Sequence, residues 1–250
     1  MKNRIILFIS FLGLGGIFWW TLPNNKAQVI VCDVGQGDAI LVTYKNIQML
    51  FDTGPDNKKL MTCLEDHVPF WDKTIEVVIL SHGDSDHIGG LNDLLKSYKV
   101  AQLFSNEQNI YSQKIGQNEI VSTNMFDFEV VSSGENNGND DSIVGYLTSK
   151  RKEGWSMFMS GDISAEIEQR LVWRKTVDKP VDVLKVSHHG SETATSEEIL
   201  EILEPKIAVI SVGKNNNFGH PREKTLERLK SKNIEIRRTD LEGEIIFSLN

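Results

Sequence analysis

The sequence predicts an α/β fold with two mixed β-sheets and helices on their outer sides. Short apolar runs come first as a meander of strands, and further along the chain they alternate with segments of helical period, which is typical of this class. The composition is that of a globular protein, with 40% hydrophobic and 25% charged residues in a chain of 250, and it excludes a disordered or fibrous protein. Residues 27–250 have the size of one large α/β domain.

The N-terminal segment, residues 1–26, has the features of a membrane anchor. Lys2 and Arg4 precede an uncharged apolar stretch over residues 5–22, and a helix of these 18 residues would span about 27 Å, close to the thickness of the hydrocarbon core. The basic residues predict that the N-terminus lies inside and that the domain lies on the extracytoplasmic side. A cleaved signal peptide is the alternative, and the domain would then be secreted.

The rest of the chain divides into apolar runs that predict strands and amphipathic segments that predict helices. We expect strands over residues 28–34, 39–44, 47–51, 76–80, 100–104, 126–131, 143–148, 155–159, 181–186, 206–212, 234–237 and 244–249. The helices are expected over residues 91–98, 164–173, 196–203 and 222–232. Ser164 stands at an N-cap position of the second helix, and Pro205 closes the third.

The net charge of −8 and the two cysteines exclude several classes of protein. An acidic chain is not built to coat nucleic acid through its own positive charge, although an enzyme that holds a phosphodiester through metal ions stays open. Two cysteines exclude a disulfide-dense scaffold and a cysteine-rich zinc module. Cys32 lies in an apolar run and is interpreted as a buried thiol, while a disulfide with Cys63 stays open for an exported chain.

The richest cluster of polar residues follows the predicted strand 76–80 directly. Four residues of metal-binding type fall within six positions: His82, Asp84, Asp86 and His87. In an extended turn, residues two apart point the same way, so the first three can converge while His87 faces a second position. Charged groups crowded at a strand end are costly unless they bind a cation. The cluster therefore predicts a metal site, and either aspartate is available to orient a water molecule.

Two further loops carry residues of ligand type after apolar strands. Asp162 comes directly after a glycine, where a carboxylate can bridge two ions or complete one site; an acid at a helix N-terminus is the alternative. His188 and His189 end the strand 181–186. Because neighbours in a strand point to opposite faces, we expect His188 to be a ligand and His189 to orient a ligand or act on the substrate.

Three more basic residues are candidates for weaker roles. Lys185, inside the strand 181–186, either meets an anionic substrate oxygen as a catalytic residue or lies on a solvated face of the sheet. His220 precedes Pro221, which is suited to begin the next helix, and we expect it to contact a metal or the substrate. His67 has no comparable neighbours and is interpreted as structural.

Two glycine-containing loops after strands contain Asp38 and Asp52. A nucleotide-binding interpretation fails, because Gly35-x-Gly37 lacks the third glycine and opens a strand rather than a helix. We expect these loops to form the floor of the same site, with the two aspartates orienting metal ligands from behind; acids of ordinary turns are the alternative.

Seven motifs occur in order along the chain, and together they resemble the metallo-β-lactamase superfamily, specifically the hydrolase domain of ComEC-type DNA-uptake proteins. They are DVGQGDA (33–39), FDTGP (51–55), SHGDSDHIGG (81–90), NDDSIV (139–144), SGD (160–162), LKVSHHGS (184–191) and GHP (219–221). The resemblance implies a four-layer αββα sandwich with the site at one edge. It also implies phosphodiester hydrolysis, with degradation of one DNA strand. A separate channel protein is an expected partner, because the chain has one apolar segment instead of a polytopic channel region.

The resemblance also implies a divalent metal cofactor, with one or two ions. The superfamily motif is His-x-His-x-Asp-His, and Asp84 stands in place of its second histidine, while no histidine lies in 139–142, where a third histidine motif would fall. An oxygen-rich position favours Mn²⁺ or Mg²⁺ over the Zn²⁺ of a three-histidine site. We expect Asp86, His87, Asp162 and His188 to hold one ion and His82 and Asp84 to hold or complete another. Bound water would then attack phosphorus.

Three alternatives to the nuclease interpretation remain. The first is a metallohydrolase of another ester, such as a lactone or a small phosphodiester, since a fold does not determine its substrate. The second is a non-catalytic, membrane-tethered DNA-binding module that uses the basic residues of 222–238, although acids are interleaved there. The third is a subunit that docks on a channel protein, which is compatible with an enzyme.

Overall fold

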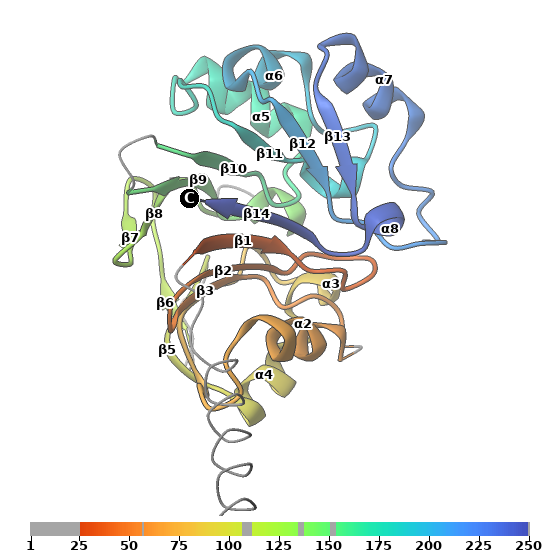
Figure 1. Cartoon of the computed structure of the whole chain (residues 1–250). Coiled ribbons are helices and arrows are strands. Elements are labelled where there is room, and N and C mark those ends of the chain that lie inside the picture. Colours follow the sequence, from red (N-terminus) through yellow and green to blue (C-terminus); the bar gives the residue numbers. More distant parts are fainter. Residues whose placement is uncertain (1–25, 57, 107–111, 135–137, 151–153, 250) are drawn as a thin grey trace, which may run out of the picture.

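The computed structural model describes residues 26–56, 58–106, 112–134, 138–150 and 154–249. These residues form two seven-stranded β-sheets that pack face to face, and helices cover the outer side of each sheet (Figure 1). The four layers confirm the predicted αββα sandwich. The predicted anchor lies outside the described residues, apart from Lys26. Within those residues, no helix has the length and apolar character needed to cross a bilayer.

The first sheet begins with the predicted antiparallel meander and continues with parallel strands. The first three strands pair antiparallel, and the next pairings across the sheet are parallel. The last strand of the chain pairs antiparallel with the first one and so joins the two ends of the domain. In sheet order the strands are β14 (Ile245–Leu249), β1 (Ala27–Val31), β2 (Ile40–Tyr44), β3 (Ile47–Phe51), β4 (Thr74–Ile79), β5 (Lys99–Ser105) and β6 (Gln113–Lys114).

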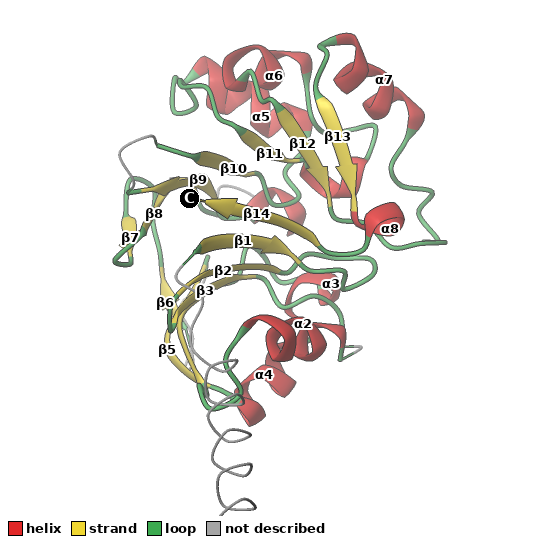
Figure 2. Cartoon of the chain, in the orientation of Figure 1, coloured by secondary structure: helices red, strands yellow, loops and turns green. Residues whose placement is uncertain are grey.

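The second sheet has the same mixed construction. Its antiparallel part is formed first along the chain, and four parallel strands follow, each separated from the next by a helix. In sheet order the strands are β13 (Glu235–Arg238), β12 (Ile207–Ile210), β11 (Val183–Lys185), β10 (Ser156–Met159), β9 (Val144–Ser149), β8 (Phe126–Ser132) and β7 (Ile120–Ser122). Figure 2 shows the helices segregated from the two facing sheets.

The helices lie in two outer layers, so the core has three apolar layers instead of one. The layer between the sheets contains Val29 and Val31, whereas Ile30 packs with the helices under the first sheet. This alternation follows from the twofold side-chain period of a strand. Helices α2 (Lys59–His67), α3 (Ser85–Ile88) and α4 (Leu91–Ser97) flank the first sheet, α5 (Ala165–Trp173), α6 (Glu197–Leu203) and α7 (Glu223–Ser231) flank the second, and α8 (Thr239–Glu242) leads into β14.

Every predicted strand and helix has a counterpart in the structure, with ends that differ by a few residues. Helix α2 was not predicted, because its N-cap residue Lys58 is left-handed and offers no side-chain cap. Helix α3 was expected as an extended turn, which was wrong. Ser164 is the N-cap residue of α5, yet its side chain makes no capping bond, and its backbone N–H instead donates to Asp140 Oδ1 at 2.7 Å.

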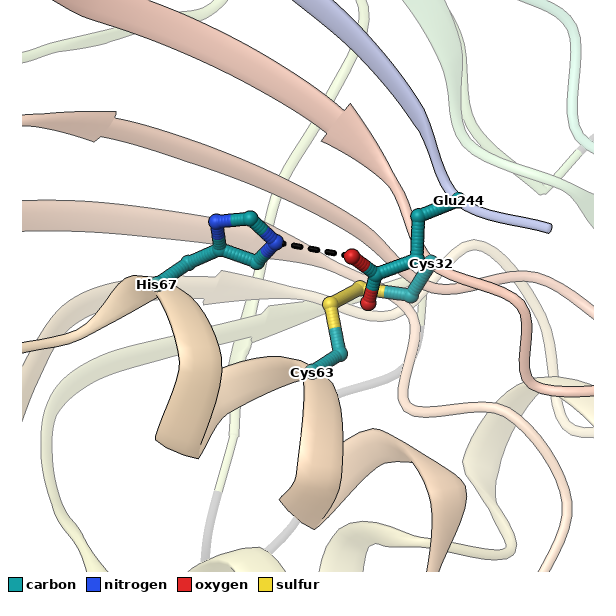
Figure 3. Close-up of a disulfide and its surroundings, with 4 residues drawn as sticks. All are labelled: Cys32, Cys63, His67 and Glu244. Atoms are coloured by element: carbon teal, nitrogen blue, oxygen red, sulfur yellow. Dashed lines mark hydrogen bonds and ion pairs between the residues drawn. A yellow bond between two sulfur atoms is a disulfide. The ribbon is translucent and has the colours of Figure 1, made fainter.

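A disulfide joins Cys32, just after β1, to Cys63 in α2 (Figure 3). The interpretation of Cys32 as a buried thiol was therefore wrong, although both cysteines are buried. Beside the disulfide, His67 Nε2 lies 2.8 Å from Glu244 Oε2, just before β14. A covalent bond and this polar contact thus fasten helix α2 to the two strands that join the ends of the domain.

Loss of the disulfide should destabilise the domain. The two cysteines are 31 residues apart, and a cross-link over such a loop reduces the entropy of the unfolded chain by an amount worth about 3–4 kcal/mol. We expect the double variant Cys32→Ala, Cys63→Ala to have a free energy of unfolding lower by that amount, measured by urea unfolding. Reductant should lower the stability of the wild-type protein and leave the double variant unchanged. Equal stabilities with and without reductant would contradict the expectation.

Candidate metal centre

The polar loops meet at one edge of the sandwich, where the parallel strands of both sheets end. Loops that follow neighbouring parallel strands emerge at the same edge of a sheet, which is why residues far apart in sequence become neighbours. The central histidines and aspartates come from five loops and helix α3. They are Asp38 before β2, Asp52 after β3, His82 and Asp84 after β4, Asp86 and His87 on α3, Asp162 after β10, and His189 after β11.

Three imidazoles converge at this edge, and each is held from behind through Nδ1. His82 Nδ1 lies 3.0 Å from Ser81 Oγ, and His87 Nδ1 lies 2.8 Å from Asp52 Oδ2. The Nδ1 of His189 donates to the backbone carbonyl of Ser211 at 2.8 Å. Hydrogen bonds of this kind select the tautomer of a histidine and orient its other nitrogen.

The Nε2 atoms of these histidines are buried and have no hydrogen-bond partner among the described residues. Buried nitrogen atoms without a partner are rare, because each costs the free energy of desolvation. The carboxylate of Asp162 lies among them, with its Oδ2 at 3.3 Å from the Nε2 of both His87 and His189. Asp86 Oδ2 lies 3.3 Å from His189 Nε2. Nitrogen and carboxylate donors arranged in this way fit a divalent cation.

Two overlapping donor sets can be drawn from these atoms. One consists of His82, His87 and Asp162, and the other of Asp86, His87 and His189; within each set the donor atoms all lie within 4.8 Å of one another. His87 belongs to both sets. The arrangement therefore suits one ion, or two adjacent ions of which only one is bound by His87.

A buried ion pair lies behind the donor atoms. Lys185, at the end of β11, is 1% exposed, and its Nζ lies 2.5 Å from Asp38 Oδ2 and 3.2 Å from Asp162 Oδ1. It also donates to the carbonyl of Gly161 at 2.9 Å. The expectation that Lys185 meets a substrate oxygen or lies on a solvated face is not met, because its donors are used inside the protein. Its ammonium offsets the negative charge of two buried aspartates.

Asp84, His188 and His220 lie around the rim and not at the centre. Asp84 is exposed, with Oδ2 at 3.7 Å from His82 Nε2. His188 is half-buried, and its Nε2 lies 3.3 Å from Asn139 Nδ2, away from the donor sets. His220 faces His188, with ring centroids 5.7 Å apart. The structure thus brings His189 into the centre and leaves His188, for which the sequence predicted ligation, beside it.

The local backbone explains this exchange of positions. His188 and His189 do not continue the strand, because both are left-handed, with φ of 48° and 52°. The left-handed region costs free energy for residues other than glycine, and such strain is common at functional sites. The strict alternation on which the sequence prediction relied therefore does not apply to this pair.

Electrostatics divides the titratable groups of the centre clearly. Burial alone would lower the pKa of His189, but the carboxylates of Asp162 and Asp38 raise it to about 9. Burial would likewise lower the pKa of His87, but the carboxylates of Asp162 and Asp52 outweigh burial and raise it. Burial would raise the pKa of Asp86, whereas His189 and His87 lower it to about 2. Asp86 is thus anionic, and the rings of His87 and His189 retain protons that a cation would displace, whereas burial lowers the pKa of His82.

Several residues that support the centre were not assigned a role from the sequence. Ser142 Oγ lies 3.3 Å from His82 Nδ1 and accepts from the N–H of Asp162. Glu168 on α5 is buried and accepts a hydrogen bond from Ser187 Oγ at 2.8 Å, which fastens the start of the histidine turn. Ser142 falls within the motif NDDSIV, so a signal existed for it. Glu168 carries none, because a glutamate on a helix is ordinary.

Removal of the Lys185 ammonium should destabilise the metal-free protein. Lys185→Met conserves much of the volume and leaves Asp38 and Asp162 as buried charges without their cation, which typically costs about 3–5 kcal/mol. Urea unfolding in the presence of a chelator measures the loss. Lys206→Met is the matched control, because Lys206 pairs with Asp182 at the exposed surface, and its loss should destabilise the protein far less than the loss of Lys185. Similar losses in both variants would contradict the role of Lys185.

Metal binding should release protons at neutral pH. A protonated imidazole cannot bind a cation, and the raised pKa values of His87 and His189 keep these rings protonated at pH 7. We therefore expect the affinity for Mn²⁺ or Zn²⁺ to rise as the pH increases toward about 9. Calorimetry in buffers with different enthalpies of ionisation measures the protons released. Binding without proton release would refute the assignment of these two histidines.

Comparisons with known proteins agree with this arrangement. Residues 32–119 match the metallo-beta-lactamase superfamily. ComE operon protein 3 of Bacillus subtilis (strain 168) is 30% identical over 92% of this chain and 34% of its own length, and competence protein ComA of Neisseria gonorrhoeae is 29% identical over 91% of this chain and 33% of its own length. The chain thus spans about a third of these curated relatives.

The fold is shared with solved structures at much lower identity. The metallo-beta-lactamase fold protein YhfI from Bacillus subtilis superposes with a TM-score of 0.60 at 10% identity, covering 90% of this chain and all of the other. At such identity the likeness concerns the fold alone. The sequence matches, the two facing sheets and the cluster at their edge identify the chain as a member of the metallo-β-lactamase superfamily, of the kind found in ComEC-type competence proteins.

Proposed function

We propose that the chain is a metal-dependent phosphodiesterase that cleaves single-stranded DNA during DNA uptake. The observation that carries the proposal is the convergence on the Asp162 carboxylate of three buried Nε2 atoms that have no hydrogen-bond partner within the described part of the chain. The superfamily supports hydrolysis, and the competence proteins among the relatives support DNA as the substrate. The membership of His82, His87, His189, Asp86 and Asp162 in the donor sets supports their assignment as metal ligands.

The donor set favours a hard cation in at least part of the site. Asp84 occupies the rim beside His82, at the position where the superfamily has a nitrogen ligand, and its carboxylate can complete an oxygen-rich site. Oxygen ligands favour Mn²⁺ or Mg²⁺, whereas the remaining histidines also suit Zn²⁺. We assign His189, in place of His188, to the ligand set, because its Nε2 lies beside Asp86 and Asp162.

A bound divalent cation would supply Lewis acidity toward a phosphoryl oxygen and increase the acidity of water. The protein provides the orientation and the proton transfers. Asp84 is the exposed carboxylate of the group and can accept a proton from water as a general base. Asp52 holds His87 through Nδ1, and Ser211 holds His189, so neither ring can turn away.

His188 is the residue we assign to the substrate. The Nδ2 atom of Asn139 can only donate, so His188 Nε2 accepts at 3.3 Å and the ring carries its proton on Nδ1. Burial lowers the pKa of His188, so the ring is neutral at pH 7. A neutral imidazole at the rim can donate a hydrogen bond to a phosphate oxygen without competing for the cation.

We also propose that the domain acts on the extracytoplasmic side of a membrane. The disulfide supports this location, because disulfides persist in oxidising compartments. The apolar stretch over residues 5–22 would anchor the chain or be cleaved as a signal peptide. A separate channel protein would then take up the strand that the enzyme leaves intact.

The decisive experiment compares variants of the centre with variants of the rim. The whole 250-residue chain in detergent, stripped of metal, is supplied with Mn²⁺, Mg²⁺ or Zn²⁺ and single-stranded DNA. We expect Asp86→Ala, His87→Ala and His189→Ala to lose more than about a hundredfold in kcat. His188→Ala should bind metal as the wild type does and lose about tenfold to a hundredfold in kcat.

Metal content after dialysis separates the two histidines. His189→Ala should retain less metal than the wild type, and His188→Ala should retain the same amount. Full activity in Asp86→Ala or His87→Ala would refute the proposed site. A folded, metal-loaded wild-type protein that cleaves no DNA but hydrolyses a lactone or a small phosphodiester would show another substrate class, and salt-dependent DNA binding without any hydrolysis would indicate a binding module.

A further inference from the structure

We propose that Phe218 and Arg222 form a nucleotide subsite beside the metal centre, in which a nucleobase stacks on the Phe218 ring and an adjacent phosphate pairs with the Arg222 guanidinium. This inference rests on the proposed function, because it specifies how the same site holds a single strand. Neither residue belongs to the metal donor sets.

A continuous series of aromatic rings leads from the metal centre to Phe218. The His189 and His188 ring centroids are 6.3 Å apart, and His188 is 5.7 Å from His220. The His220 ring in turn stacks on Phe218, with centroids 5.9 Å apart and planes that differ by 11°. Phe218 therefore lies three ring contacts from a residue of the centre, and its ring is backed by an imidazole on one side.

Phe218 is exposed on a loop that hydrogen bonds hold in one conformation. The ring is 58% exposed, although an apolar side chain of this size is normally buried. Asn216 organises the loop by accepting from the N–H groups of Phe218 and His220 at 3.1 and 3.0 Å. The Asn216 amide group also donates to the carbonyls of Gly213 and His220. Phe218 is thus presented to solvent in a prearranged position, which lowers the entropic cost of binding a flat ligand.

Arg222 supplies a positive charge beside the loop that carries Phe218. A β-carbon on Gly219 would lie 3.2 Å from Arg222 Nη1, so the absence of a side chain there lets the guanidinium lie against the loop. Several exposed lysines among the described residues pair with an acid, for example Lys224 with Glu192. Within the part of the chain that the structure describes, Arg222 has no such ion pair. An unpaired cation on a protein of net charge −8 complements an anionic ligand.

A flat apolar surface and an unpaired guanidinium together match the two halves of a nucleotide. Stacking on an aromatic ring accepts any base, because every base has a π face, and arginine binds phosphate through its planar fork. This combination is used by proteins that hold single strands without reading their sequence. Trp173 is more exposed than Phe218 but lies at the end of α5, without the ring contacts that connect Phe218 to the centre.

The test uses two probes on the whole chain in detergent: labelled oligothymidylate and the same strand without its bases. Phe218→Ala should raise KM and Kd for oligothymidylate about tenfold, which corresponds to about 1.4 kcal/mol, while kcat changes little. On the abasic strand, Phe218→Ala should match the wild type. Phe218→Trp should bind oligothymidylate as the wild type does, and Trp173→Ala is the matched control for loss of an exposed aromatic ring.

Arg222→Gln should weaken binding of both strands and reduce the slope of log Kd against log salt concentration by about one. Binding is measured by fluorescence anisotropy with a chelator present, so that it does not depend on turnover. If the wild type cleaves DNA but Phe218→Ala has unchanged KM and Kd, the subsite is wrong and the proposed function stands. If no cleavage occurs but Phe218→Ala weakens binding of oligothymidylate alone, the function is wrong and the subsite stands. If Phe218→Ala lost the same affinity for the abasic strand as for oligothymidylate, Phe218 would have a structural role and the base-stacking proposal would be wrong.

Discussion

The arrangement of the centre depends on one constraint: three imidazoles must present Nε2 to the same point while their Nδ1 atoms are held by separate parts of the chain. Asp52 comes from the first sheet, Ser142 precedes β9, and the carbonyl of Ser211 follows β12. Asp52 and His87 follow strands of the first sheet, whereas Ser211 and His189 follow strands of the second, so the three Nε2 atoms meet only when both sheets have formed and packed. The donor geometry is therefore a product of the whole sandwich and cannot exist in a fragment that contains one sheet.

The same convergence concentrates negative charge, and the structure offsets it in two ways. Lys185 pairs with Asp38 and Asp162 inside the protein, which leaves the outward sides of Asp162 and Asp86 facing the histidines. The remaining excess of carboxylates raises the pKa values of His87 and His189. A cation of higher charge than a proton is the natural partner for such a group, because it interacts with several carboxylates at once.

A disulfide and a buried carboxylate stabilise the segments next to the loops that carry the site. The Cys32–Cys63 disulfide lies just before the loop that carries Asp38 and within the helix that follows the loop of Asp52. Glu168 fastens Ser187, which begins the left-handed turn at His188 and His189. In this way the strained turn is held by hydrogen bonds to a buried carboxylate, which offsets its unfavourable backbone conformation.

The sequence by itself determined the class of fold, the positions of most strands along the chain and the chemistry of the cluster. Periodicity over short segments identifies strands and helices because it records which side of an element is buried, and four ligand-type residues within 82–87 form a pattern that a solvated turn rarely shows. Asp162 and the histidine pair were likewise visible as polar groups that end apolar strands.

Only the tertiary structure decided which of these groups face the centre. The left-handed backbone at His188 and His189 turns His189 inward, although alternation along a strand favoured His188. Burial between Asp38 and Asp162 converts Lys185 from an expected substrate contact into an internal counterion. The disulfide required Cys32 and Cys63 to meet across 31 residues. Each of these outcomes depends on contacts between distant segments, which local sequence patterns do not record.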